Sequence, residues 1–518
     1  MELDDRALPL TRGQLDIWLA QELAQQLGQE RGRCATEWQL GLLARVEGRV
    51  DREYLQQAIR QVVREAEPGR AAFCEVDGQV VQRVIDYPDV ELAFYDLRGA
   101  QDPVQDVGEI ASSIQRTPMP LSGPLFKFAL FQTRGDEFYL FACCHHIVID
   151  GLGMVLVSRR LATIYTAIVR GKPIPAAYFG SLHDLVDFES EYEASSDFLQ
   201  DRAYWRSRLP PEGDPAYRLP DTVTVGDSYS ASAQVPLDPS VVTSIHPLAK
   251  ALRIRRSSVL TAACALLVRG WSGSGSQVVL DFPVSRRVRP ESKMLPGMLA
   301  GVVPLVLTAS PQSTVADFCV QVDTRIRELL QHQRFPAHTL EASGGLRGPG
   351  QVANRVGVNF IPSRLTLDLA GVPATATYTN HGPVGHFGLF FLGAGDRLYL
   401  RTAGAGQPFA SFDVSYLANR LQQILAEMTA DPSRLLSSIE VLDVDEQARL
   451  DEWGNRGVLD RPATPAVSIP DVFAAQVART PVAVALTFGD RSWTYRELDE
   501  SANRLAHLLV AQGAGPGG

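Results

Sequence analysis

The chain is poor in cysteine, with only 6 in 518 residues. No two of them have CxxC spacing, and they are scattered mainly through apolar segments: Cys34, Cys74, Cys143, Cys144, Cys264 and Cys319. A disulfide framework or a cysteine zinc site is therefore not expected. Cys143 and Cys144 lie within an apolar stretch, where a thiol usually acts as inert packing and not as a nucleophile.

The sequence also lacks an excess of positive charge and any long apolar run. Its formal net charge is -10 at pH 7, so it has no basic field that would attract nucleic acid. The apolar runs are too short to span a membrane, and residues 1–5 lack the basic and apolar regions of a secretory signal. We therefore predict a cytoplasmic protein that binds neither nucleic acid nor membrane.

Three common enzyme signatures are absent as well: a GxSxG elbow, an HExxH zinc motif and an intact Walker loop. The composition, 45% hydrophobic and 21% charged, is ordinary for a soluble globular chain. A length of 518 residues allows roughly three or four domains. A catalytic histidine in this chain would act without an obvious protein nucleophile, which favours direct transfer between two bound substrates.

Potential chemistry concentrates in residues 145–151, which spell HHxxxDG. The apolar stretches 125–131 and 138–144 predict two strands, the second of which ends at the histidines. Apolar residues then recur at helical spacing over 157–168, so a helix should begin at or just after Gly151. The motif is therefore predicted in a strand-to-helix loop, where an imidazole can titrate near neutral pH.

Simpler interpretations of the motif remain open. A single histidine at a strand end is more often a hydrogen-bonded core residue than a catalyst, and Asp150 could be the N-cap of the following helix. Metal binding is disfavoured because neighbouring side chains on a strand point to opposite faces, which hinders joint coordination by His145 and His146. The His-His pair followed by Asp-Gly still favours a proton-handling site.

Further segments accompany HHxxxDG in a fixed order. Residues 10–19 are similar to LTxxQxxIWxxQ, residues 281–287 to GTPVxxR, residues 297–305 to GMFVNTLPL, and residues 332–336 to HQxxP. This ordered set resembles the condensation domains of nonribosomal peptide synthetases, which are relatives of chloramphenicol acetyltransferase and the carnitine acyltransferases. The resemblance covers roughly residues 8–450.

The resemblance implies an α/β fold of the α+β sandwich type, in which two chloramphenicol acetyltransferase-like lobes form a V-shaped pseudo-dimer around a tunnel. Residues 1–175 would form the N-terminal lobe and residues 176–450 the C-terminal lobe. Periodicity alone supports only the α/β class. It predicts a helix over about 257–268, a strand over 277–282 and a helix through 318–329.

The resemblance also implies a reaction. An aminoacyl amine on the 4'-phosphopantetheine of an acceptor carrier protein attacks an acyl or peptidyl thioester on a donor carrier protein, and an amide bond forms. His146 is implied to orient the amine or to remove its proton. The chain itself is expected to bind no cofactor and no metal.

The other residues of the motif are implied to support the loop. His145 would hold it through hydrogen bonds, and Asp150 would form an ion pair with Arg287, or with Arg286 if the alignment is shifted by one. The backbone N–H of Gly151 would face the thioester carbonyl or the developing oxyanion.

Several positions depart from the family pattern. Residues 65–73 lack the histidine and leucine of RHExLRTxF, and their Pro-Gly pair suggests a turn. Gly153 replaces a common serine and Gly301 replaces the asparagine of FVNT; these losses either enlarge the tunnel or mark a subclass. With Asn359, these glycines are the candidates for tunnel lining.

The opening motif and residues 358–362 are closer to those of initiating modules or of modules fed by separate carriers. We therefore expect the donor to arrive from another chain.

The end of the sequence resembles a second family. Residues 472–473, 479–481 and 493–498 are similar to the beginning of an adenylation domain, but the nucleotide-binding motifs do not follow. We predict a truncated adenylation fragment over 471–518 after a linker at 451–470, with the remainder of the synthetase module as a partner. Roughly fifty residues bury little core alone, so the fragment should be loosely ordered or docked on the C-terminal lobe.

Three alternative functions remain. An epimerisation domain shares HHxxxD, but it normally follows a carrier and does not precede an adenylation domain. A non-catalytic recruitment module usually loses its histidines, which are present here. A modifying condensation domain, which dehydrates a residue or forms an ester, would retain every motif of this sequence.

Overall fold

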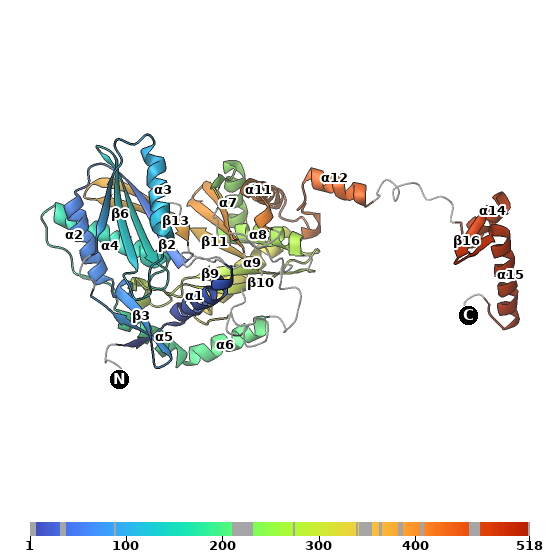
Figure 1. Ribbon diagram of the computed structural model, residues 1–518, viewed down its shortest axis with the longest axis horizontal. Helices are drawn as coiled ribbons and strands as arrows, with labels where there is room; N and C mark the ends of the chain where they lie inside the picture. Colours follow the sequence, from blue (N-terminus) through green and yellow to red (C-terminus); the bar gives the residue numbers. More distant parts are fainter. Residues whose placement is uncertain are drawn as a thin grey trace. The chain divides into compact units, whose positions relative to one another are not determined.

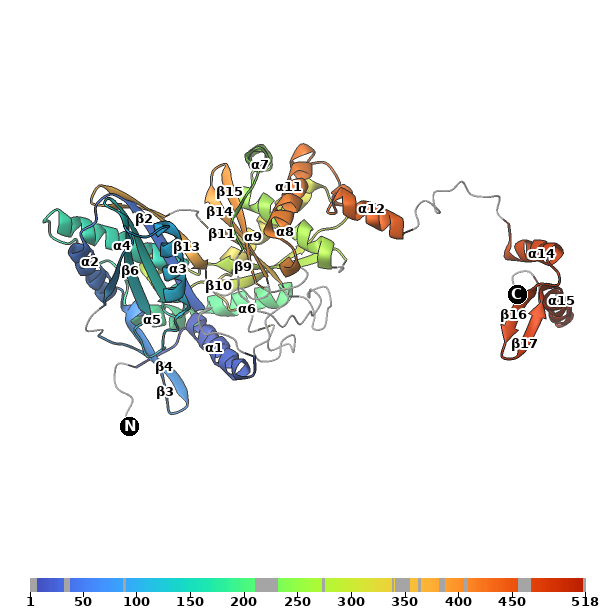
Figure 2. The same ribbon diagram turned by 45° about the horizontal axis from the view of Figure 1, so that its top comes forward.

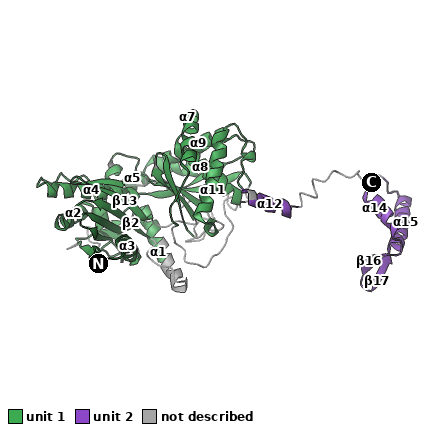
Figure 3. Ribbon diagram, turned by 90° about the horizontal axis from the view of Figure 1, so that it is seen from above, with its two compact units in different colours: residues 1–441 green, residues 442–518 purple. Residues whose placement is uncertain are grey.

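The computed structural model describes residues 7–31, 38–86, 90–209, 232–272, 275–337, 340, 355–361, 365–381, 387–404, 409–454 and 467–515. The chain forms two compact units, residues 1–441 and residues 442–518 (Figure 3). Residues 1–5, Cys34, Pro362 and most of the predicted linker at 451–470 lie outside the described residues.

The first sheet of the larger unit has 6 strands in the order β12-β13-β2-β7-β6-β5. Neighbouring strands are antiparallel except for the parallel pair β5–β6. The strands are β2 (Gln39–Glu47), β5 (Leu92–Asp96), β6 (Phe126–Arg134), β7 (Glu137–His145), β12 (Leu365–Leu369) and β13 (Val372–His381). The strands predicted from the apolar stretches before the histidines are therefore confirmed as β6 and β7.

Helices cover this sheet (Figure 1): α2 (Arg52–Glu65), α3 (Pro103–Arg116) and α4 (Gly151–Val169). α2 packs against α4 with the apolar side chains of Leu55, Ile59 and Val62, which recur at helical spacing and are fully buried. α4 begins at Gly151, as predicted, and its N-cap is Asp150.

The second sheet has 6 strands in the order β10-β9-β11-β14-β15-β8. They are β8 (Val235–Pro236), β9 (Gln277–Val284), β10 (Gly301–Thr308), β11 (Val356–Ile361), β14 (Phe387–Ala394) and β15 (Arg397–Ala403). The accompanying helices are α7 (Pro239–Leu252), α8 (Arg256–Ser272), α9 (Val315–Gln331) and α11 (Val414–Ala430) (Figure 2). The helices predicted around 257–268 and 318–329 and the strand predicted at 277–282 are thus confirmed, as is the α/β class.

The two sheets are not separate in the sequence. β12 and β13 belong to the second half of the chain, yet β13 pairs with β2 in the first sheet and lies beside it in both views (Figures 1 and 2). The pairing shifts register between Tyr378 and Asn380. The lobe boundary at residue 175 stays a prediction, and the second half of the chain completes the sheet that contains the strands of the first half.

The N-terminal segment and the region between the lobes supply shorter elements: α1 (Arg12–Arg31), β1 (Leu8–Pro9), β3 (Ala71–Val76), β4 (Gln79–Val84), α5 (Leu182–Glu193) and α6 (Ser196–Arg208). The Pro-Gly pair expected to turn lies in a short 3-10 helix, Glu67–Arg70. A Cβ at Gly69 would approach the ring of Phe126 to 2.4 Å, so the close packing of this turn on β6 requires glycine.

The smaller unit contains α12 (Val444–Trp453), α14 (Ile469–Arg479), β16 (Val484–Phe488), β17 (Arg491–Thr494) and α15 (Tyr495–Ala511). β16 and β17 pair antiparallel, and α15 contacts both strands. No side chain of α14 or α15 is buried. These elements form with very little core, as expected of a short segment.

Candidate active site

HHxxxDG lies between β7 and α4. His145 is the last residue of β7, and its N–H donates to the carbonyl of Leu125 at 3.0 Å; the N–H of His146 donates to the carbonyl of Trp38 at 2.7 Å. The apolar residues between the histidines and Asp150 are fully buried. The backbone of both histidines is thus fixed by neighbouring segments.

His145 is a core residue, with 1% of its surface exposed. Its Nδ1 accepts the N–H of Ile147 at 3.2 Å, while its Nε2 is buried without a partner among the described residues. Burial, and after it the proximity of His146, lowers the pKa of His145 to about 3. The ring is therefore neutral at physiological pH and supports the loop through Nδ1.

His146 is half-buried, and its Nδ1 has no hydrogen-bond partner in the described part of the chain. Burial lowers the pKa of His146, opposed by a contact with its own backbone and by the charge of Asp150. Its imidazole is consequently neutral near pH 7.

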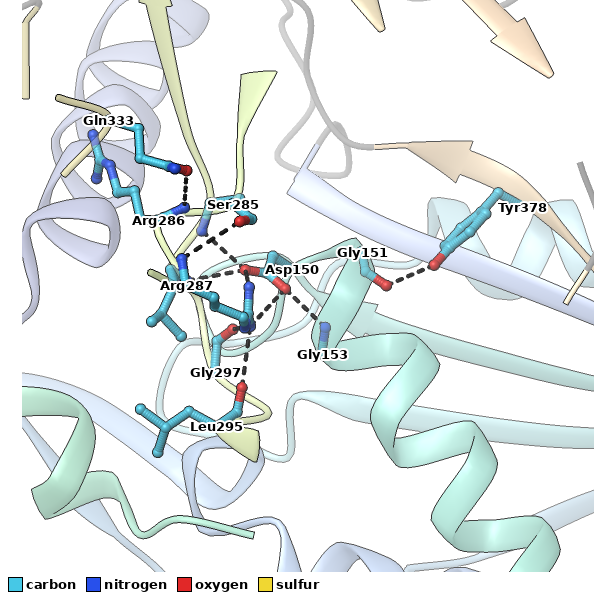
Figure 4. Close-up of polar contacts among 12 residues, drawn as sticks. Asp150, Gly151, Gly153, Ser285, Arg286, Arg287, Leu295, Gly297, Gln333 and Tyr378 are labelled. Atoms are coloured by element: carbon cyan, nitrogen blue, oxygen red, sulfur yellow. Dashed lines mark hydrogen bonds and ion pairs between the residues drawn. The ribbon is translucent and has the colours of Figure 1, made fainter. Parts of the chain in front are cut away.

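Asp150 is fully committed to structure (Figure 4). Its carboxylate caps α4 by accepting the N–H of Gly153 at 2.8 Å, and it also accepts the N–H groups of Leu299 and Ala300 at 3.1 and 2.9 Å. Arg287 donates to both carboxylate oxygens at 2.7 and 3.0 Å. Burial alone would raise the pKa of Asp150, but the charge and hydrogen bonds of Arg287 outweigh it, and the pKa is lowered.

The ion pair expected between Asp150 and Arg287 is therefore present, with side chains 1% and 2% exposed. Arg287 also donates to the carbonyls of Leu295 and Gly297, both at 3.1 Å. The pair ties the start of α4 to the segment between β9 and β10. Arg286 is not the partner of Asp150. It lies toward Gln333 (Figure 4), whose Oε1 accepts the backbone N–H of Arg286 at 3.0 Å.

Tyr378 is a site residue that the sequence did not reveal. Its hydroxyl donates to the carbonyl of Gly151 at 2.8 Å (Figure 4), and burial raises its pKa, so the hydroxyl remains protonated. It comes from β13, the strand contributed by the second half of the chain. No local signal could have identified it, because its role depends on which sheet β13 joins.

Two of the three candidates for tunnel lining are closely packed. A Cβ at Gly153 would lie 2.7 Å from Cγ1 of Ile149, and a Cβ at Gly301 would lie 2.4 Å from Cζ of Arg286. The space left by the absent side chains is already filled at both positions. Both glycines therefore permit close packing. That they and Asn359, half-buried in β11, line a tunnel stays a prediction.

The cysteines beside the motif match the interpretation as packing. Cys143 and Cys144 are fully buried; burial raises the pKa of Cys143 to about 12, and it raises that of Cys144 as well. Thiols of this kind are not nucleophiles near neutral pH. Within the described ranges, no group of three or more histidine, cysteine, aspartate or glutamate side chains is arranged to hold a metal ion.

α4 is the one described helix that is long and apolar enough to cross a membrane. Its inward residues belong to the first core, and it packs against α2 and β12. Core helices of soluble proteins pass the same test, so this feature is weak evidence for a membrane span.

Comparisons with known proteins agree with this architecture. The condensation-domain family model matches residues 6–450, and the model of the AMP-binding enzymes matches residues 473–518. The chain is 28% identical over 526 residues to the dimodular nonribosomal peptide synthase of Bacillus subtilis (strain 168), covering 99% of this chain and 21% of that protein. It is 30% identical over 539 residues to the isonitrile lipopeptide synthase of Mycobacterium tuberculosis, again covering 99% and 21%.

Solved structures show the same fold. The first condensation domain of the calcium-dependent antibiotic synthetase, in complex with a substrate analogue, has a TM-score of 0.73 and 26% identity, covering 85% of this chain and 100% of that one. The starter condensation domain of rhizomide synthetase has a TM-score of 0.73 and 25% identity, covering 85% and 98%. The chain spans 21% of the length of the two curated synthetases. It belongs to the condensation domains of nonribosomal peptide synthetases, a family of amide-forming acyltransferases, and continues into the beginning of an AMP-binding domain.

Proposed function

We propose that this condensation domain joins a carrier-bound acyl or peptidyl donor to a carrier-bound aminoacyl acceptor. The acceptor amine attacks the donor thioester carbonyl, an N–C bond forms, the C–S bond breaks, and the donor carrier's phosphopantetheine thiol leaves. The amine loses one proton and the leaving sulfur gains one. No protein nucleophile or resident cofactor is required.

One observation carries this proposal. His146 is the half-buried histidine of the pair, while the carboxylate of Asp150 already accepts hydrogen bonds from Arg287 and from backbone N–H groups. A neutral imidazole can take the proton of the attacking amine and return it to the sulfur. Proton transfer by a positioned side chain typically contributes about 10²–10⁴-fold. Positioning of the two tethered reactants supplies the rest of the rate acceleration, since effective molarities can exceed about 10⁵ M.

Gly151 would stabilise the developing oxyanion. It is the first residue of α4, where backbone N–H groups lack intrahelical acceptors and the helix dipole favours negative charge. The Tyr378 hydroxyl donates to the carbonyl of Gly151 and so helps to hold the first turn of α4 in place. A preorganised N–H is most effective when aimed at charge that appears only in the transition state.

The partners in this proposal are a donor and an acceptor carrier protein and the remainder of the adenylation domain, all in the cytoplasm. The similarity to a starter condensation domain supports a place in an initiating module, or in one whose donor arrives on a separate chain. The curated relatives, among them enterobactin synthase component F of Escherichia coli, are larger assemblies, so the final product is a property of the whole synthetase.

The test loads an acyl group on one carrier and an aminoacyl group on another and follows both by intact-protein mass spectrometry. Condensation adds the donor acyl mass to the acceptor carrier and frees the donor thiol. Loss of water from the acceptor, or exchange of its α-proton without mass transfer, would instead identify a modifying or epimerising domain. His146→Ala is the paired variant, and unchanged turnover in it would remove the assignment of His146.

A further inference from the structure

Arg286 combines features that the ion pair beside it does not explain. The residue is 6% exposed, its Nε is buried without a partner, and its guanidinium makes no hydrogen bond to any described residue. A buried cation without hydrogen-bond acceptors is unfavourable. The carboxylates of Glu189 and Asp16 act on the guanidinium through their charge, but its Nε still has no acceptor at hydrogen-bond distance among the described residues, and a ligand oxygen would supply one.

The backbone holds Arg286 in place at a conformational cost. Its φ is +55°, in the left-handed region that few side chains occupy. The Oε1 of Gln333 accepts its N–H at 3.0 Å, and Gln333 is itself fixed by a hydrogen bond from Nε2 to the carbonyl of Leu330 at 2.8 Å. Such strain persists only where the surroundings impose it, and it is common at ligand sites.

Gly301 makes room for the guanidinium. An ideal Cβ at this position would lie 2.4 Å from Cζ of Arg286 and 2.5 Å from its Nε, so any side chain there would displace Arg286. The backbone of Gly301 is not in the left-handed region, so glycine is needed here for space and not for conformation. Arg286 and Gly301 thus form a matched pair.

The guanidinium lines a small pocket next to the histidine loop. Its other lining residues include Glu189, Met298, Leu299 and Arg334, and Leu299 donates its N–H to Asp150. Arg334 is occupied by the carbonyl of Phe188 at 2.6 Å. Glu189 accepts the N–H of Arg12 at 2.5 Å, and burial raises its pKa. The Arg334 guanidinium also lies over the rings of Phe188 and Tyr192, whereas the Arg286 guanidinium forms no hydrogen bond with a described residue.

We propose that Arg286 is a specificity-determining residue that binds a carboxylate on a carrier-bound acyl group, in the small pocket that its guanidinium lines. A guanidinium presents paired N–H donors in a planar fork that matches a carboxylate. This inference rests on the proposed function, because the carboxylate must reach the pocket from a substrate held at His146. It is carried either by the side chain of the acceptor or by the donor acyl group.

The test compares isosteric substrates that differ only in charge. One arm uses glutamyl and glutaminyl thioesters on the acceptor carrier; the other uses succinyl and succinamoyl thioesters on the donor carrier. We expect at least a tenfold higher kcat/KM for the carboxylate in one arm, which identifies its source. We expect this preference to disappear in Arg286→Met and in Gly301→Ala, mainly through a higher KM.

Arg289→Met and Gly357→Ala are the matched controls. Arg289 is exposed in the same segment, and a Cβ at Gly357 would have no neighbour nearer than 3.7 Å, so both variants should keep the preference. Thermal melting separates a substrate role from a structural one: Arg286→Met should melt no lower than the parent, because it removes a buried guanidinium whose Nε lacks a hydrogen-bond acceptor among the described residues.

Equal turnover of carboxylate and amide substrates in both arms would overturn the assignment of Arg286, as would a charge preference that survives in Arg286→Met. Unfolding of Arg286→Met would do the same, since it would show that the guanidinium is structural. Absence of condensation with every substrate pair would instead refute the proposed function, so the two failures are distinguishable.

Discussion

The two ends of HHxxxDG differ in how completely their polar groups are paired. At Asp150, both carboxylate oxygens bind Arg287, and the remaining acceptor capacity is taken by backbone N–H groups. At the histidines, Nε2 of His145 and Nδ1 of His146 have no partner among the described residues. A fully paired group holds structure, whereas the half-buried ring of His146 is the part of the motif that a substrate can approach. This difference supports the proposal that acid–base chemistry belongs to the histidine end.

The largest effect is expected from breaking the paired end. Asp150→Ala leaves Arg287 buried without its carboxylate and removes the cap of α4. Breaking one half of a buried ion pair costs about 3–5 kcal/mol, so the free energy of unfolding, measured by urea denaturation, should fall by that amount and activity should fall with it.

Asp102→Ala is the matched control, because Asp102 is also a helix N-cap but is exposed and accepts only the N–H of Gln105. Loss of that cap costs about 1 kcal/mol. Equal destabilisation by the two variants would show that the ion pair adds nothing beyond the cap.

The next effect separates the two histidines. His146→Ala should lower kcat about 10²–10⁴-fold with little change in stability, because the ring is half-buried and its Nδ1 makes no hydrogen bond. His145→Asn keeps an acceptor for the N–H of Ile147 and should lower kcat less than about tenfold. Single-turnover transfer between loaded carriers measures both; a larger loss in His145→Asn would reverse the assignment.

A smaller effect concerns stability and pH. The pKa of His145 is lowered to about 3 in the folded state from an ordinary value near 6.5. Between these values the unfolded chain binds more protons, so stability should fall as pH falls. One pKa unit corresponds to about 1.36 kcal/mol, so the loss between pH 6.5 and 5 should reach up to about 2 kcal/mol.

His145→Asn should flatten that slope by the same amount, measured by denaturation at each pH. Asp150 does not contribute in this window: its folded pKa is lowered, so its share of stability is lost only below its ordinary value of about 3.9. A slope that is unchanged in His145→Asn would mean that this ring is not buried as a neutral group.

The spacing of apolar residues predicted the secondary structure around the motif. It placed the strand that ends at His145 and the helix that begins at Gly151, because alternation and helical spacing record which face of each element is buried. The Asp150–Arg287 pair joins residues 137 positions apart, and only the family resemblance indicated it. The order of charged residues along a sequence does not show which distant arginine will pair with a given aspartate.

The sequence did not predict how side chains pack around the motif. Gly153 and Gly301 suggested empty space, yet Ile149 and Arg286 fill it, because the absence of a side chain does not show which neighbour moves in. The crossing of β12 and β13 into the first sheet was not predicted either. Strand propensity does not specify the sheet that a strand joins.

The smallest effect tests that crossing at Tyr378. Tyr378→Phe removes the hydrogen bond to the carbonyl of Gly151, which should cost about 1 kcal/mol of stability and loosen the first turn of α4, so that kcat falls by less than about tenfold. Tyr165→Phe is the matched control: its hydroxyl accepts the N–H of Asp51 at 3.0 Å, at the start of α2 and away from HHxxxDG. It should lose similar stability and keep its kcat. If both variants keep kcat, the contact from β13 stabilises the fold without orienting Gly151; if only Tyr378→Phe loses it, the strand from the second half of the chain contributes to the reaction.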